Sequence, residues 1–147
     1  GRINLPLPLQ DAMKLSPIIV VEEPLEARSE RIYREYIVQQ WQDYQEYFPS
    51  QPEARFENYL LTAVDSIRKR LGGAAHIRIR QQMKEACKYQ QKNDCLELHL
   101  GWISALLRDY YDPMYDYQLE KKALRVRARD SRQALAEWYN DTLGHRA

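Results

Sequence analysis

Two strand-like segments near the ends of the chain constrain its fold most, because the pattern between them is helical. Residues 18–22 open with a run of β-branched side chains, which is typical of a strand buried on both faces of a parallel sheet. Residues 123–129 alternate apolar and basic side chains, with Leu124, Val126 and Ala128 on one side, and predict a second strand. Two strands are too few for an α/β sheet. We therefore expect a C-terminal fragment of a larger protein whose other strands lie upstream.

Amphipathic helices are predicted between these strands, because apolar residues recur there every three or four positions. The predicted helices are about 24–48, 53–71, 74–92 and a fourth that Asn93–Asp94 could cap and Asp112–Pro113 would end. Their apolar stripes include Tyr36, Tyr59, Ala63, Ile79, Met83, Ala86, Cys87 and Leu98. Four helices with short links predict an antiparallel helical subdomain. Ser131 is placed to cap a last helix over about 131–143.

The predicted fold class is α/β, predominantly helical. Residues 1–35 are assigned to a partial α/β domain, 36–120 to an inserted helical subdomain, and 121–147 to a closing strand and helix. The chain contains no glycine-rich phosphate loop, because Gly72–Gly73 lies between two helices without a strand before it.

Charge and composition narrow the function classes. The net charge of +1 does not by itself indicate a nucleic-acid-binding protein, so any basic surface must come from local clustering. No segment resembles a signal peptide or a membrane span, and we expect a cytoplasmic protein without a membrane partner. Cys87 and Cys95 are interpreted as reduced thiols. His76, His99 and His145 lack metal-ligand spacing, and His99 is interpreted as a core histidine, so no metal site and no catalytic residue are predicted.

A row of arginines follows the first predicted strand. Arg28, Arg31 and Arg34 recur every three residues at the start of a helix. Ligands of α/β proteins bind where strands run into helices, and guanidinium groups suit phosphate or pyrophosphate oxygens. The alternative is a solvated face with ion pairs to the neighbouring glutamates Glu26, Glu30 and Glu35.

A second set of basic residues surrounds the predicted turn at Gly72–Gly73 and continues along the third helix. Like charges four residues apart repel one another, and a polyanion lying along them would offset that repulsion. Contact with the RNA backbone is one interpretation, and a solubilising surface is the other. The residues are Arg68, Lys69, Arg70, Arg78, Arg80, Lys84, Lys88 and Lys92.

Tyrosines are concentrated in residues 110–117. Tyr111, Tyr115 and Tyr117 are candidates for stacking on bases, with Lys121 and Lys122 holding phosphate. Alternatively, the tyrosines anchor the helices by packing, with their hydroxyls bonded locally.

The segment Tyr110–Lys122 closely resembles the C-terminal motif of the bacterial tRNA 2-selenouridine synthase family. The family has similar residues before, within and after the first predicted strand. The matching stretches here are Gly1–Ile3 with Leu5–Pro6, Ile19–Glu22 and Pro24–Arg28. The resemblance spans nearly the whole chain. It implies the C-terminal part of a P-loop-type parallel-sheet domain with an inserted helical subdomain, and Arg28 is its best candidate for pyrophosphate contact.

The same resemblance implies an activity for the full-length protein. Family members replace sulfur by selenium in 2-thiouridine at the tRNA wobble position, through an S-geranylated intermediate. Selenophosphate and geranyl pyrophosphate are the implied co-substrates, and tRNA is the implied partner. A catalytic rhodanese cysteine and a phosphate-binding loop are expected in upstream regions, and neither Cys87 nor Cys95 matches that cysteine. We expect no cofactor in this chain and no activity from it alone.

Two other hypotheses stay open from the residues. One is a stand-alone helical module that binds RNA or protein, indicated by the amphipathic helices and the basic stripe. The other is half of a P-loop small-molecule kinase, indicated by the strand followed by an arginine-bearing helix.

Overall fold

The computed structural model describes residues 5–143, with side chains described to residue 140. Its contacts divide the chain into two compact units. We call Pro24–Tyr115 the helical unit, and residues 1–23 with 116–147 the sheet unit. The sequence-based boundaries lay instead near residues 35 and 120. No helix among the described residues has both the length and the apolar character needed to span a membrane.

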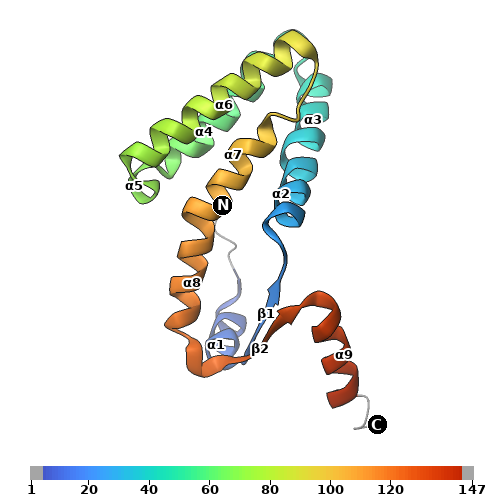
Figure 1. Ribbon diagram of the computed structural model, residues 1–147, viewed down its shortest axis with the longest axis vertical. Helices are drawn as coiled ribbons and strands as arrows, with labels where there is room; N and C mark the ends of the chain where they lie inside the picture. Colours follow the sequence, from blue (N-terminus) through green and yellow to red (C-terminus); the bar gives the residue numbers. More distant parts are fainter. Residues whose placement is uncertain (1–4, 144–147) are drawn as a thin grey trace. The chain divides into compact units, whose positions relative to one another are not determined.

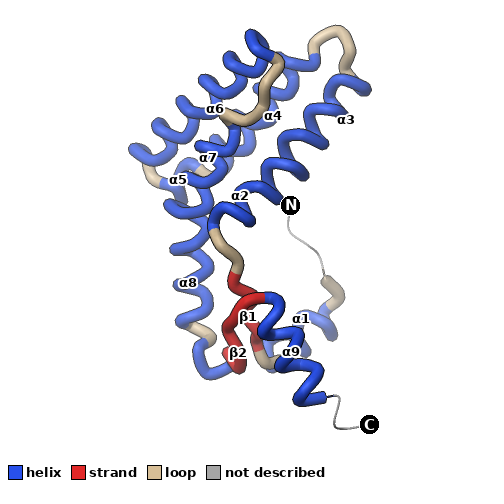
Figure 2. The backbone as a smooth tube through the Cα atoms, turned by 45° about the vertical axis from the view of Figure 1, so that its right-hand side comes forward, coloured by secondary structure: helices blue, strands red, loops and turns tan. Residues whose placement is uncertain are grey.

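The sheet unit contains the two predicted strands, paired in parallel (Figure 2). Its elements are α1 (Leu7–Leu15), β1 (Ile18–Glu22), a 3-10 turn η3 (Ala123–Arg125), β2 (Val126–Ser131) and α9 (Arg132–Leu143). The register pairs Ile18 with Val126 and Glu22 with Ser131. The Ser131 hydroxyl accepts a hydrogen bond from the Ala134 backbone at 3.3 Å, so the predicted N-cap of the last helix is confirmed.

Two details of the predicted strands are wrong. Ile19 and Val21 are about half exposed, because within this chain only one face of β1 is covered. Leu124 lies in the 3-10 turn before β2 and is 92% exposed, whereas Val126 and Ala128 are half-buried as the alternation predicts.

The helical unit consists of helical rods in an up-and-down arrangement, which confirms the antiparallel prediction (Figure 1). The first rod runs through α2 (Leu25–Tyr33), a π-helical turn η1 (Arg34–Val38) and α3 (Gln39–Tyr47). The following elements are α4 (Pro52–Ser66), α5 (Arg68–Leu71), α6 (Gly73–Asn93), α7 (His99–Leu106), a second π-helical turn η2 (Leu107–Tyr111) and the start of α8 (Asp112–Glu120). The residues of α8 after Tyr115 belong to the sheet unit. Contacts join α3 to α4, α4 to α6, α6 to α7, and α7 back to α2.

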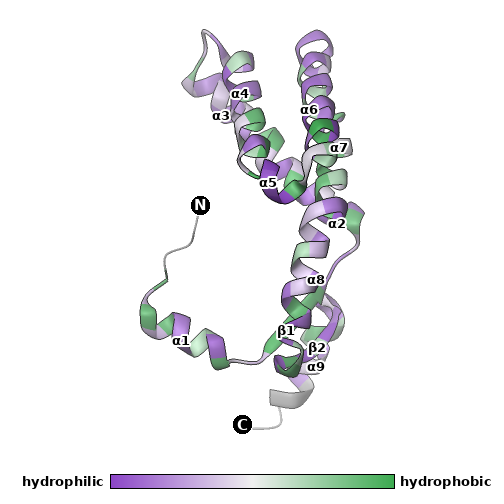
Figure 3. Ribbon diagram, turned by 90° about the vertical axis from the view of Figure 1, so that its left-hand side faces the viewer, coloured by the Kyte–Doolittle hydropathy of each residue, from purple (hydrophilic) through white to green (hydrophobic). Residues whose placement is uncertain are grey.

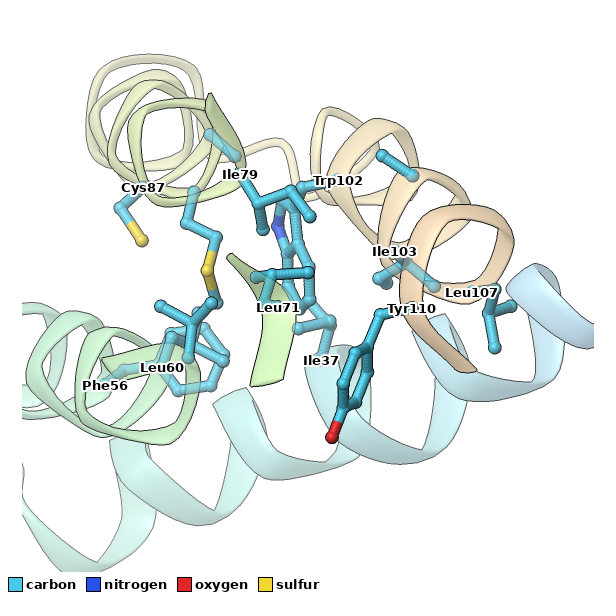
Figure 4. Packing of buried hydrophobic residues seen from close by; sticks show 14 of the residues in the cluster. Ile37, Phe56, Leu60, Leu71, Ile79, Cys87, Trp102, Ile103, Leu107 and Tyr110 are labelled. Carbon is cyan, nitrogen blue, oxygen red and sulfur yellow. The ribbon is translucent and has the colours of Figure 1, made fainter. Parts of the chain in front are cut away.

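The core of the helical unit lies between these rods (Figure 4). Each rod contributes an apolar stripe at helical spacing, and burial of these stripes supplies most of the stabilising free energy. The third predicted stripe is confirmed in full, because Ile79, Met83, Ala86 and Cys87 are all buried. The other buried members include Ile37, Trp41, Phe56, Leu60, Val64, Leu71, Trp102, Ile103, Leu107 and Tyr110.

The two π-helical turns explain two wrong predictions. A π-helical turn accommodates an extra residue and so rotates the side chains that follow it. Tyr36 lies within η1 and is 54% exposed, although simple helical spacing placed it on the buried stripe. The second turn, η2, ends two residues before Pro113, and its wider hydrogen-bond spacing lets the proline enter a continuous rod. The predicted helix end at Asp112–Pro113 is therefore wrong.

The predicted cap at Asn93–Asp94 is also wrong. Asp94 has a left-handed backbone, with φ 51°, and ends α6 rather than starting the next helix. A further turn separates it from α7, so Leu98 precedes that helix and is 48% exposed.

Candidate functional site

Arg28 and Asp112 bring together two of the segments on which the family resemblance rests, Pro24–Arg28 and Tyr110–Lys122. Arg28 lies in α2, and Asp112 opens α8. The two terminal guanidinium nitrogens of Arg28 donate to the two carboxylate oxygens of Asp112, at 2.5 and 2.9 Å. These hydrogen bonds hold the pKa of Asp112 below its ordinary value. The pair thus fixes the N-terminal end of the first rod against the tyrosine-rich segment.

A tyrosine cluster lies directly beside this pair along the chain. The rings of Tyr110 and Tyr111 meet edge to face at 4.9 Å, and those of Tyr111 and Tyr115 lie nearly parallel at 6.4 Å. Tyr110 is buried in the core, Tyr111 is half-buried, and Tyr115 is 55% exposed. Burial is the main cause that raises the pKa of Tyr111, with contributions from neighbouring tyrosines. Tyr110 therefore has the packing role, and only Tyr115 presents a largely open ring.

The other two arginines of the row are placed differently from Arg28. The Nε of Arg34 donates to Glu30 at 2.9 Å on an exposed surface, which is one of the ion pairs that the sequence indicated. Arg31 is exposed on the same helix. No residue spacing identifies Asp112 as the partner of Arg28, because 84 residues separate them.

The basic residues near Gly72 divide into two groups. Arg80 donates through Nε to Asp65 at 2.9 Å, and Arg78 donates to Asp109 at 2.5 Å. Hydrogen bonds from Arg80 and then His76 hold the pKa of Asp65 below its ordinary value. The Arg80–Asp65 pair could have been predicted from the sequence. The two residues lie equally far from the Gly72–Gly73 link, so they face each other when the two helices fold back on one another.

The second group has no partner of this kind. Arg68, Lys69 and Arg70 form most of the short helix α5, are exposed, and make no side-chain ion pair or hydrogen bond within the described part of the chain. The α5 region stands out as strongly hydrophilic in Figure 3. Lys84 and Lys88 on α6 are likewise without a carboxylate partner among the described residues. We call Arg68, Lys69 and Arg70 the α5 basic cluster.

The lysines after the tyrosine-rich segment belong to the sheet unit. The ammonium group of Lys121 lies over the ring of Tyr117, 4.3 Å from its centroid. Tyr117 is 57% exposed, and Lys122 is also exposed. The predicted stacking residue and the predicted phosphate-binding residue therefore contact each other.

The cysteines and histidines have structural environments. Cys87 is buried, which raises the pKa of its thiol to about 12, and Cys95 is half-buried; both are free. His99 is fully buried, with Nε2 3.1 Å from Gln90 Oε1 and Nδ1 accepting from the Trp102 indole at 2.9 Å, which confirms its assignment as a core histidine. Within residues 5–140, no cluster of three His, Cys, Asp or Glu side chains could hold a metal ion. His145 lies outside the described residues.

The chain is similar to proteins that modify tRNA. A family model described as the tRNA 2-selenouridine synthase AAA domain matches residues 1–146. The tRNA 2-selenouridine synthase of Pseudomonas fluorescens (strain Pf0-1) is 42% identical over 138 residues, which cover 94% of this chain and 38% of the relative. Those of Alcanivorax borkumensis and Shewanella oneidensis are each 40% identical, over 95% and 96% of this chain and 39% and 38% of the relatives. The chain thus spans well under half the length of these relatives. No solved structure matches.

Proposed function

Because the chain belongs to the tRNA 2-selenouridine synthase family, we propose that it forms part of the tRNA-binding surface of an enzyme that replaces sulfur by selenium in 2-thiouridine. The nucleoside is the one at the wobble position of tRNA. The reaction is a transferase reaction in which selenophosphate supplies the selenium, and geranyl pyrophosphate supplies the group carried by an S-geranyl intermediate. The proposed setting is the cytoplasm.

The observation that carries the tRNA-binding role is the α5 basic cluster. Arg68, Lys69 and Arg70 present three adjacent cationic side chains to solvent, without a carboxylate partner in the described chain. Such side chains gain binding free energy from phosphates by releasing the counterions condensed on the nucleic acid. Lys84 and Lys88 on α6 also lack a carboxylate partner among the described residues, whereas the charges of Arg78 and Arg80 are already compensated. The α5 basic cluster is thus the best-placed phosphate contact in the helical unit.

We assign the catalytic steps to the part of the full-length relatives that this chain does not match. A rhodanese cysteine and a P-loop in that part would act on sulfur, selenium and phosphate. This chain would bind the tRNA and orient it. Arg28, Arg31 and Arg34 are the proposed pyrophosphate contacts. For Arg28 this contact requires Asp112 to release the guanidinium group, because a pyrophosphate would take the position that the carboxylate now holds.

The experiment is selenium incorporation by a protein of full family length that contains this chain. The substrate is tRNA carrying 2-thiouridine at the wobble position, incubated with selenophosphate and geranyl pyrophosphate, and the nucleosides are analysed by mass spectrometry. The proposal predicts 2-selenouridine, and S-geranyl-2-thiouridine when selenophosphate is withheld. Unmodified 2-thiouridine in both reactions would contradict it.

A further inference from the structure

A cavity of about 740 Å³ lies between the end of α3 and one flank of α4, and we infer that it binds an unpaired nucleobase of an RNA. We call it the α3–α4 groove. It lies within the helical unit and includes none of the residues discussed above as phosphate contacts. The residues that line it are Tyr44, Phe48, Gln51, Ala54, Arg55, Asn58, Tyr59, Thr62, Ala63 and Ser66.

The groove exists because the apolar stripe of α4 is wider than the face that the core covers. Phe56, Leu60 and Val64 are buried. Tyr59 and Ala63 lie on the same stripe by their spacing, yet both are exposed and line the groove, contrary to the sequence-based expectation. An aromatic side chain left open on a helix flank is available for contact with a ligand.

Three aromatic rings form one wall of the groove. The centroid of Tyr44 lies 5.4 Å from that of Phe48 and 5.7 Å from that of Tyr59. Tyr44 also contacts the buried ring of Phe56, at 5.5 Å, which anchors the group to the core. Phe48 and Tyr59 each keep 36% of their surface exposed. A pre-formed set of partly open rings is the kind of surface on which unpaired bases stack.

The polar lining fits a nucleotide better than an apolar occupant. The guanidinium group of Arg55 lies over one face of the Phe48 ring, 4.5 Å from its centroid, so Tyr59 is the ring left open for stacking; no lining residue is acidic. The amides of Gln51 and Asn58 can donate to and accept from base edges. A lipid chain or an apolar helix would gain no hydrogen bond from these exposed amides or from the guanidinium group. A base stacked on Tyr59 with its phosphate near Arg55 would use both the open ring and the cation.

The size of the groove agrees with this occupant. Small-molecule sites commonly enclose roughly 300–1,000 Å³, and the α3–α4 groove falls within that range. Burial, and then the neighbouring Tyr59, raise the pKa of Tyr44. A tyrosine is in any case neutral at pH 7, so its hydroxyl can donate a hydrogen bond. The inference deepens the proposed function, and rests on it only for the identity of the RNA as tRNA.

The test uses the 147-residue chain and a short fluorescein-labelled oligouridine, with binding followed by fluorescence anisotropy. Tyr59→Ala removes a stacking surface and should weaken binding about tenfold or more. Tyr59→Phe keeps the ring and should bind within about twofold of the original chain. Tyr47→Ala is the matched control, because Tyr47 is 69% exposed on the same helix as Tyr44 and does not line the groove. Circular dichroism melting of each variant separates lost binding from lost folding.

Photocrosslinking gives a second readout that needs no substitution. A 4-thiouridine oligonucleotide should crosslink to the peptide that spans residues 44–66. Equal affinity of Tyr59→Ala and the original chain, or crosslinks confined to other peptides, would overturn the inference. So would a dimer of the chain that Tyr59→Ala dissociates, because the groove would then hold a second copy. Oligonucleotide binding without selenium incorporation would overturn only the proposed function. Selenium incorporation without oligonucleotide binding at the α3–α4 groove would overturn only the inference about the groove.

Discussion

Arg28 and Asp112, 84 residues apart, form a bidentate ion pair in which each carboxylate oxygen accepts a hydrogen bond from one guanidinium nitrogen. Both side chains are about 30% exposed, so water screens the pair only in part. The pair joins α2 to the start of α8 within the helical unit. Ser29, the next residue, is buried and accepts a hydrogen bond from Ser104 of α7 at 2.9 Å. Two adjacent residues of α2 thus bind the last rod through polar contacts.

We predict that Asp112→Asn destabilises the helical unit by roughly 1.5–3 kcal/mol, the usual range for a hydrogen bond to a charged group. The substitution removes the carboxylate charge and one acceptor from a partly buried guanidinium group. Urea unfolding of the chain measures the change. Glu30→Gln is the control, because it removes the exposed partner of Arg34 and should change the free energy of unfolding by less than about 1 kcal/mol. Equal effects of the two substitutions would show that the Arg28–Asp112 pair has no special role.

His99 predicts a pH dependence of stability. Burial lowers the pKa of His99 to about 4 from its ordinary 6.5. The unfolded chain takes up a proton near pH 6.5, whereas the folded chain does so only near pH 4. The neutral histidine therefore contributes its full stability above pH 6.5, and that contribution is lost progressively as the pH falls toward 4, by roughly 3 kcal/mol in all.

NMR titration of the His99 ring measures this pKa directly. Urea unfolding at pH 7 and pH 5 should give a lower stability at pH 5. In His99→Gln, which cannot titrate, that difference should shrink if the variant folds. A His99 ring that titrates near pH 6.5 would refute the prediction.

Two glycines should respond in opposite ways to alanine. Gly72 has φ 86° and ψ 150°, a conformation that side chains rarely adopt, so Gly72→Ala should destabilise the chain by about 1–3 kcal/mol. Gly101 lies inside α7 with nothing within 4 Å of an added Cβ. Gly101→Ala should therefore stabilise by about 0.5–1 kcal/mol. Thermal melting of both variants tests these two predictions. A loss of stability in Gly101→Ala would contradict the second.

Most of the helical unit could be predicted from sequence, because periodicity reports which face of a helix is buried. The stripe through Ile79 and Cys87 is entirely in the core, and the parallel strands were indicated by a β-branched run and a distant alternating segment. Errors arose where local geometry departs from the ideal helix. The π-helical turns at Tyr36 and before Pro113, and the left-handed Asp94, have no signature in residue spacing.

The candidate site could be predicted only in part. The sequence identified the arginine row, the basic residues and the tyrosines as separate sets. It could not reveal which cations meet carboxylates, because that depends on packing between distant segments. Arg28 meets Asp112 and Arg78 meets Asp109, while the α5 basic cluster stays uncompensated among the described residues. The α3–α4 groove could not be predicted from the sequence, because its aromatic residues have the same helical spacing as core residues.

The central claim is that the α5 basic cluster contacts tRNA phosphates, and a salt titration of tRNA binding tests it most directly. The variant is Arg68→Gln/Lys69→Gln/Arg70→Gln. The control is Lys14→Gln/Arg108→Gln, whose cations are exposed but paired with Asp11 and Asp109. Each lost phosphate contact should reduce the slope of log K against log salt by roughly 0.9. We predict a slope smaller by about 2–3 in the triple variant and nearly unchanged in the control. A triple variant that keeps the original slope and affinity would contradict the account.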